Sequence, residues 1–119
     1  MGDAVPVSDE DAVRAEILSS ATEDLHGVWE AWWIANRLFP TLRLSARLSL
    51  AEQALSSLVA GGLVTISRGS WDSQVAMPAE DVRELLREYD TWVASDKADL
   101  TFFEATPTGR EAYGLPADA

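Results

Sequence analysis

Two stretches of this chain have the composition of β-strands, and their positions narrow the possible folds more than any other feature. Residues 63–68 (LVTISR) follow the pair Gly61-Gly62, and residues 100–105 (LTFFEA) are similarly rich in β-branched and aromatic side chains. The other regular patterns are helical. We therefore expect a mainly α chain with a small antiparallel β-hairpin, which is an α+β fold.

The first helical pattern begins close to the N-terminus. Ser8 and Asp11 fit a capping box, in which the serine oxygen accepts a free backbone N–H at the start of a helix. Val13, Ile17 and Ala21 then recur at helical spacing. This spacing predicts a first helix with one apolar face.

Two further helical patterns precede the first predicted strand. The second helix is expected over residues 24–39 and ends before Pro40. Its apolar residues lie on two faces, which is typical of a helix packed between neighbours, so we expect it to be the central helix. Ser49 and Glu52 fit another capping box, which predicts a third helix over residues 50–60.

About thirty residues, 70–99, separate the two predicted strands. Within this insertion the apolar spacing over 78–89 predicts one short amphipathic helix. After the second strand, Thr106 can cap a last short helix that has Pro107 at its first position. The insertion therefore contains a helix of its own.

With 119 residues the chain can bury one modest core, so we expect a single domain over 8–115 between short tails at 1–7 and 116–119. There is no cysteine, which excludes disulfides and thiolate chemistry. No apolar run approaches the roughly 18–20 residues that span a bilayer, and the acidic N-terminus is unlike a secretory signal. We therefore expect a cytoplasmic protein with no membrane partner.

Charge is unevenly distributed along a chain whose formal net charge is −11. Residues 1–30 and 72–119 each carry a net charge of −7, whereas residues 31–71 carry +3. Residues 37–47 (RLFPTLRLSAR), here called the arginine segment, hold three arginines and no acid. A contact with nucleic acid, a partner surface and ion pairing with the acidic flanks all remain open as explanations.

The order of elements resembles that of the winged helix-turn-helix superfamily, in which three helices precede a two-stranded wing. ALSSLVAGGLVTISRG (residues 54–69) is similar to a recognition helix running through glycine into the first wing strand. FFEATPTGREAY (residues 102–113) is similar to the second wing strand followed by a Thr-x-x-Gly turn. The resemblance implies a three-helix core plus a wing with a helical insertion. It also implies a transcription regulator that binds DNA and can form a homodimer.

Under this resemblance, the DNA contacts would come from the 43–68 region. Polar side chains of the third helix would face the bases, and arginines before it and at the wing would contact phosphates. The residues so assigned are Arg43, Arg47, Gln53, Ser56, Ser57 and Arg68. The third helix itself has no Lys or Arg, and five acids lie between Glu80 and Asp90 of the insertion. Both features depart from a typical DNA-binding surface.

The alternative is a protein–protein interaction module on a winged-helix scaffold that has lost DNA binding. Its partner surface would include Trp33, Arg37, Trp71 and Trp92, and its acidic insertion would favour a basic partner. A third hypothesis is an acidic mimic of nucleic acid. Arginines gathered on an open face would favour DNA binding, and arginines paired with carboxylates would favour the interaction module.

No arrangement of residues indicates catalysis or metal binding. His26 is the only histidine, and Glu30, one helical turn away, is its only evident partner for a metal. No serine is marked as a nucleophile, and no glycine-rich loop precedes a helix. We therefore expect a non-catalytic protein without a cofactor.

Overall fold

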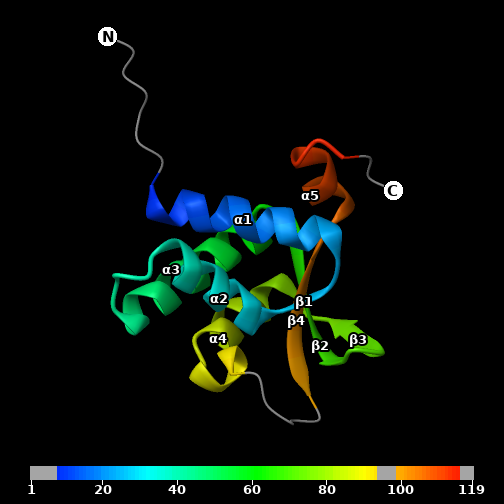
Figure 1. The fold of residues 1–119 in the computed structure, drawn as a ribbon. Coiled ribbons are helices and arrows are strands. Elements are labelled where there is room, and N and C mark those ends of the chain that lie inside the picture. The colour runs from blue at the N-terminus through cyan, green and yellow to red at the C-terminus, as the bar shows by residue number, and fades with distance from the viewer. Residues whose placement is uncertain (1–7, 94–98, 116–119) are drawn as a thin grey trace.

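The computed structural model describes residues 8–93 and 99–115, and in this part of the chain five α-helices pack with a four-stranded antiparallel sheet (Figure 1). The helices are α1 (Asp9–Glu23), α2 (Val28–Leu38), α3 (Leu44–Ala60), α4 (Ala79–Leu86) and α5 (Pro107–Ala112), with one 3-10 turn, η1 (Tyr89–Trp92). The strands are β1 (His26–Gly27), β2 (Val64–Ser70), β3 (Ser73–Ala76) and β4 (Leu100–Ala105). The predicted mixture of helix and sheet is confirmed, but the predicted hairpin is only part of a larger sheet. The predicted tails, 1–7 and 116–119, lie outside the described residues.

Helix α1 begins where the capping box placed it. The Ser8 hydroxyl oxygen accepts the Asp11 backbone N–H at 3.1 Å, and three acids fill the first turn, where the helix dipole favours negative charge. Val13 and Ile17 are fully buried on the predicted apolar face. This part of the sequence prediction is confirmed.

Helix α2 begins later than predicted, at Val28, because the two residues before it form a strand. His26 and Gly27 of β1 pair with Phe103 and Phe102 of β4. The Glu30 carboxylate accepts the Gly27 backbone N–H at 2.7 Å and so caps the helix. The predicted start at residue 24 was therefore wrong, since α1 runs to Glu23 and β1 separates the two helices.

Helix α3 begins at Leu44, six residues before the predicted start. Ser49 lies inside it, so the capping-box prediction was wrong at this position. Ala51, Ala54 and Leu55 are fully buried, and α3 contacts α1, α2, α4 and β2. Helix α2 is likewise packed between neighbours, as its two apolar faces predicted, because it contacts α1, α3, β1, β4 and η1.

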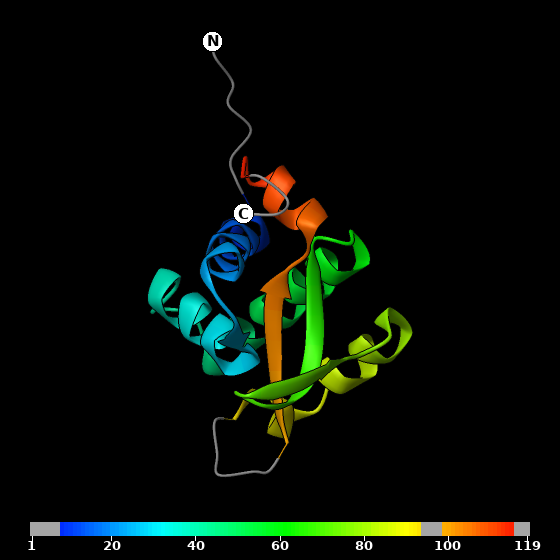
Figure 2. The ribbon, with the colours of Figure 1, turned by 90° about the vertical axis from the view of Figure 1, so that its right-hand side faces the viewer.

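The sheet has the strand order β1-β4-β2-β3, and the long strands β2 and β4 run side by side through the molecule (Figure 2). Ile66 and Phe103 are opposite each other in register, and both belong to the main core with α1, α2 and α3. Phe102, one residue earlier, points to the other face of the sheet. There it contacts the rings of Trp29 and Trp71, which cover it.

The insertion between β2 and β4 folds into β3, α4 and η1. The predicted helix within it is present, although it ends at Leu86, earlier than expected. Side chains of η1 bond to the C-terminal carbonyls of α4: Thr91 Oγ1 donates to Leu85 O, and Trp92 Nε1 donates to Leu86 O, each at 2.8 Å. Because helix ends leave carbonyls without partners, these bonds fix the end of α4.

Helix α5 closes the domain through the Thr-x-x-Gly turn. Thr106 Oγ1 accepts the Gly109 backbone N–H at 2.9 Å and donates to Gly62 O at 2.6 Å, while Thr106 N donates to Leu63 O. Gly109 is buried against the backbone of Leu63, where a Cβ would lie 2.0 Å from the carbonyl oxygen. The turn therefore requires glycine at this position.

Candidate binding surface along helices α3 and α4

Helix α4 lies beside the polar side of α3, and the two helices border a groove of about 810 Å³, here called the α3–α4 groove. Gln53, Ser56 and Ser57 of α3 line this groove. Small apolar side chains line it as well, from Val59 and Ala60 of α3 and from Ala79 of α4. Three of the six residues predicted to contact nucleic acid therefore border a groove that α4 partly closes.

Charged side chains of both signs line the α3–α4 groove. Glu10 comes from α1, Glu52 from α3, and Glu80, Arg83 and Arg87 from α4 and its C-cap. The ion pairs within the described residues join other groups, and none of these five side chains takes part in one. The groove therefore presents three carboxylates and two guanidinium groups that are free for contacts with another molecule.

Two of the groove residues already have partners within the chain. Arg14 of α1, which also pairs with Asp11, donates from Nη1 to Ser57 Oγ at 3.1 Å. Gln53 donates from Nε2 to Ser49 Oγ at 3.1 Å, one turn earlier in α3. Ser57 thus bonds to α1, and of the three residues only Gln53 is exposed, whereas Ser56 and Ser57 are half-buried.

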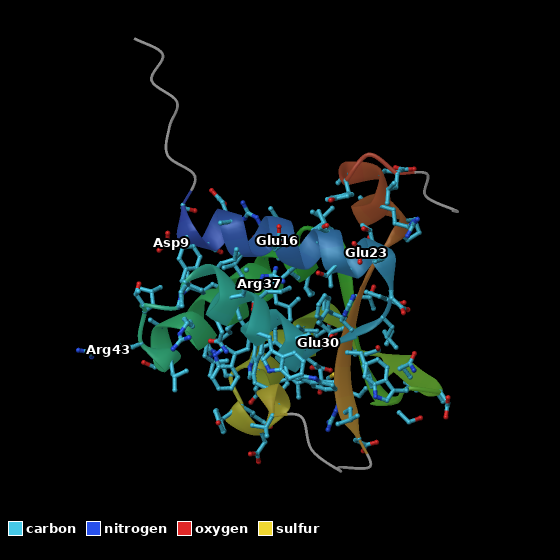
Figure 3. All side chains as sticks on the ribbon, viewed as in Figure 1. Asp9, Glu16, Glu23, Glu30, Arg37 and Arg43 are labelled. Atoms are coloured by element: carbon cyan, nitrogen blue, oxygen red, sulfur yellow. The ribbon has the colours of Figure 1, made fainter. Side chains whose placement is uncertain are left out.

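The predicted phosphate-binding arginines do not come together with these polar residues. Arg43, the N-cap of α3, is exposed and points away from the body of the molecule (Figure 3). Arg47 is half-buried, and its Nε is enclosed without a hydrogen-bond partner. Arg68 lies on β2 and lines a separate hollow of about 60 Å³ with Glu88 and Asp90.

The predicted partner residues Trp33 and Arg37 share one face of α2. Trp33 is 56% exposed, and both side chains line a hollow of about 270 Å³ together with His26 and Glu30. Arg37 donates from Nη2 to Glu16 Oε2 of α1 at 3.2 Å, and Figure 3 shows these two residues close together. At least one arginine of the arginine segment is thus paired with the acidic flank.

Trp71 and Trp92 have different environments, although both belong to the insertion. Trp71, in the turn between β2 and β3, is 52% exposed and packs against Trp29 and Phe102, with ring centroids 6.2 and 4.7 Å away. Trp92 is only 2% exposed. Its prediction as part of a partner surface was therefore wrong, because it packs in the core and caps α4.

His26 is held within the fold. Its Nδ1 lies 3.2 Å from Glu30 Oε1, and its ring stacks on Phe103 with centroids 5.6 Å apart. Across residues 8–93 and 99–115, no three His, Cys, Asp or Glu side chains gather in a way that could hold a metal ion. None of the helices in those ranges is long and apolar enough to cross a membrane.

The charged groove residues of α4 were not predicted as site residues. Their sequence signal is a helical spacing, since Glu80, Arg83 and Arg87 are three and four residues apart and therefore share one side of a helix. What the sequence did not reveal is which surface this side faces. Comparison of the chain with protein-family models, with curated proteins and with solved structures gives no match.

Proposed function

We propose that this chain is a non-catalytic protein-interaction module on a winged-helix-like scaffold, and that the α3–α4 groove is its partner surface. The order α1, α2, α3, β2, β4 supports the scaffold, because it reproduces three helices followed by two antiparallel strands. The Thr106–Gly109 turn after β4 supports it as well. The insertion of β3, α4 and η1 between the two strands is the main difference from a typical winged helix.

The observation that carries the choice of a protein partner is the position of α4. A major groove of B-DNA is about 12 Å wide and accepts one helix, whose diameter with side chains is about 10–12 Å. Packed helices lie about 8–10 Å apart, so two of them side by side are close to 20 Å wide. With α4 against its polar side, α3 is too broad to enter a major groove along that side.

The negative charge of the segment from α4 through η1 also disfavours DNA binding. The segment from α4 through η1 exposes five acids, Glu80, Asp81, Glu84, Glu88 and Asp90. Glu80 lines the α3–α4 groove itself, so its carboxylate would lie near phosphates if α3 approached a duplex, which is unfavourable. A protein surface has no uniform charge of this kind and can be complementary to the groove.

Arg43 supports the alternative, DNA binding, because it is exposed at the start of α3 and forms no ion pair within the described residues. One guanidinium group neutralises one phosphate, which is a small share of the several contacts that specific binding usually needs. The arrangement therefore favours a protein partner over DNA.

The first experiment is fluorescence anisotropy with a mixed-sequence DNA duplex, titrated at low and at physiological salt. We expect no salt-dependent binding by the wild-type chain at micromolar concentrations. Binding that weakens with salt and disappears in Arg43→Glu/Arg47→Glu, with an unchanged circular dichroism spectrum, would show that the chain binds DNA and would overturn the proposal. A variant with Glu80→Gln, Asp81→Asn and Glu84→Gln shows whether the acids of α4 oppose DNA.

A second experiment tests the groove directly. A photo-crosslinking amino acid is placed at Gln53, which lines the groove, and in a control chain at Ala15, which is exposed on α1. In cells, the groove position should give a discrete cross-linked protein species that the α1 position does not give. Equal patterns at both positions, or cross-links to nucleic acid alone, would contradict the assignment of the groove.

A further inference from the structure

We propose that the partner of the α3–α4 groove is a second copy of this chain, related by a two-fold axis, with α4 of each copy lying along the groove of the other. The inference rests on the proposed interaction function and names its partner. It does not follow from the winged-helix resemblance, which led us to expect a dimer without locating its interface.

The charges that line the groove favour a second copy of the chain as its partner. The groove holds Glu10, Glu52 and Glu80 beside Arg83 and Arg87, and none of the five is paired within the described residues. A purely basic partner would leave the two arginines covered without a counter-charge, and a purely acidic partner would do the same to the carboxylates. Covering an unpaired charge is costly, so a fitting partner carries both signs.

A two-fold contact meets this requirement without a second kind of protein. In such a contact the same surface meets itself, so if one residue touches another across the interface, the reverse contact is also made. Arg83 and Arg87 of one copy can then face Glu52 and Glu80 of the other, twice in each dimer. A surface with both signs is thus complementary to itself.

The shape of the surface fits the same arrangement. Helix α4 forms a ridge next to the groove, and its residues Ala79, Glu80 and Arg83 are exposed. The groove is lined partly by Ala60 and Val59, whose small side chains allow another helix to approach closely. A two-fold rotation places the exposed α4 of each copy opposite the groove of the other copy. Each α4 can therefore occupy the partner groove.

The overall charge of −11 does not prevent this contact. At physiological salt the Debye length is about 8 Å, so exposed charges far from the interface are largely screened from the other copy. The groove itself has three carboxylates and two guanidinium groups, a much smaller imbalance than that of the whole chain. The groove lining thus holds both signs, so opposite charges can face each other across the contact.

The test is a charge exchange measured by sedimentation equilibrium on the full chain. One variant carries Arg83→Glu and Arg87→Glu, and the other carries Glu52→Arg and Glu80→Arg. We expect the wild-type chain to dimerise and each variant alone to dimerise at least about tenfold more weakly, because like charges now face each other. An equimolar mixture of the two variants should restore the dimer as a heterodimer.

Controls separate loss of contact from loss of folding. Circular dichroism and thermal unfolding of each variant report on the fold, and Glu23→Arg, on an exposed residue of α1 outside the groove, should leave dimerisation unchanged. Restoration in the mixture is itself a control, since two unfolded variants cannot restore each other.

Two outcomes would overturn the inference. One is a wild-type chain that is monomeric up to about 200 μM, a concentration at which even a weak dimer forms. The other is a dimer that neither charge exchange weakens. Both would leave the proposed function standing if the cross-link at Gln53 reaches a different protein, whereas salt-dependent DNA binding would remove the proposed function itself.

Discussion

Gly109→Ala should destabilise the fold although it replaces glycine by a better helix former. Gly109 belongs to α5, where alanine is intrinsically favoured by about 1 kcal/mol. Its position against Leu63 opposes this gain, because the added Cβ would lie 2.0 Å from the carbonyl oxygen and 2.9 Å from the carbonyl carbon. Both atoms are backbone and cannot rotate away.

The magnitude follows from what must move. Relieving the contact displaces the Leu63 carbonyl, which accepts the Thr106 backbone N–H at 3.0 Å. Overpacking of this kind costs about 1–3 kcal/mol, and the weakened hydrogen bond costs about 0.5–1.5 kcal/mol more. After subtraction of the helix-propensity gain, we expect the free energy of unfolding to fall by about 1–3 kcal/mol.

The assay is urea unfolding followed by tryptophan fluorescence, since the chain has five tryptophans. Gly61→Ala is the matched control, because Gly61 has a φ of −79° and the nearest atom to its added Cβ is 3.5 Å away. We expect the control to stay within about 0.5 kcal/mol of the wild type or to gain slightly. Equal stability of the two variants would refute the argument that close packing on Leu63 selects glycine.

Three other substitutions test contacts elsewhere in the fold. Trp92→Phe should lower the free energy of unfolding by about 1–2 kcal/mol in the same urea assay, because it removes the N–H that bonds to Leu86 while keeping most of the ring. Trp71→Ala should cost about 1–2 kcal/mol through the lost ring contact with Phe102 and should change the fluorescence spectrum. Arg37→Ala should change stability by less than about 1 kcal/mol, because its ion pair with α1 is exposed.

Local chemistry predicted several features of the fold from the sequence alone. The Ser8 cap and the capping of α5 by Thr106 join residues three apart in the chain, and β4 has the composition of a strand, so these features are visible in the sequence. At these positions the local sequence decides the structure, and the prediction is confirmed.

Features that depend on distant partners were missed. Strand β1 is two residues long and exists because β4, more than seventy residues later, offers it an edge. No local pattern carries this information, so the segment resembled the start of a helix.

The candidate site depends on the same kind of long-range information. Residues 50–60 were predicted to be a helix with an open polar face, and most of that helix is present in α3. Whether the face is open is decided by α4, whose docking places Arg83 and Arg87 along the groove. The assignment of Gln53, Ser56 and Ser57 to DNA contacts therefore assumed that this face is open, which the local sequence cannot show. The assignment stays a prediction.

The position of the groove arginines is tied to the folding of the insertion. Val82 and Leu86, four residues apart, are buried against the body, so Arg83 and Arg87, each one residue later, must lie on the flank of α4. A change that loosens the Trp92 bond to Leu86 should therefore displace the arginines and weaken dimerisation along with stability. Gly109→Ala acts at α5, at the opposite end of the molecule from α4 (Figure 1), so it should lower stability while the folded fraction dimerises as before.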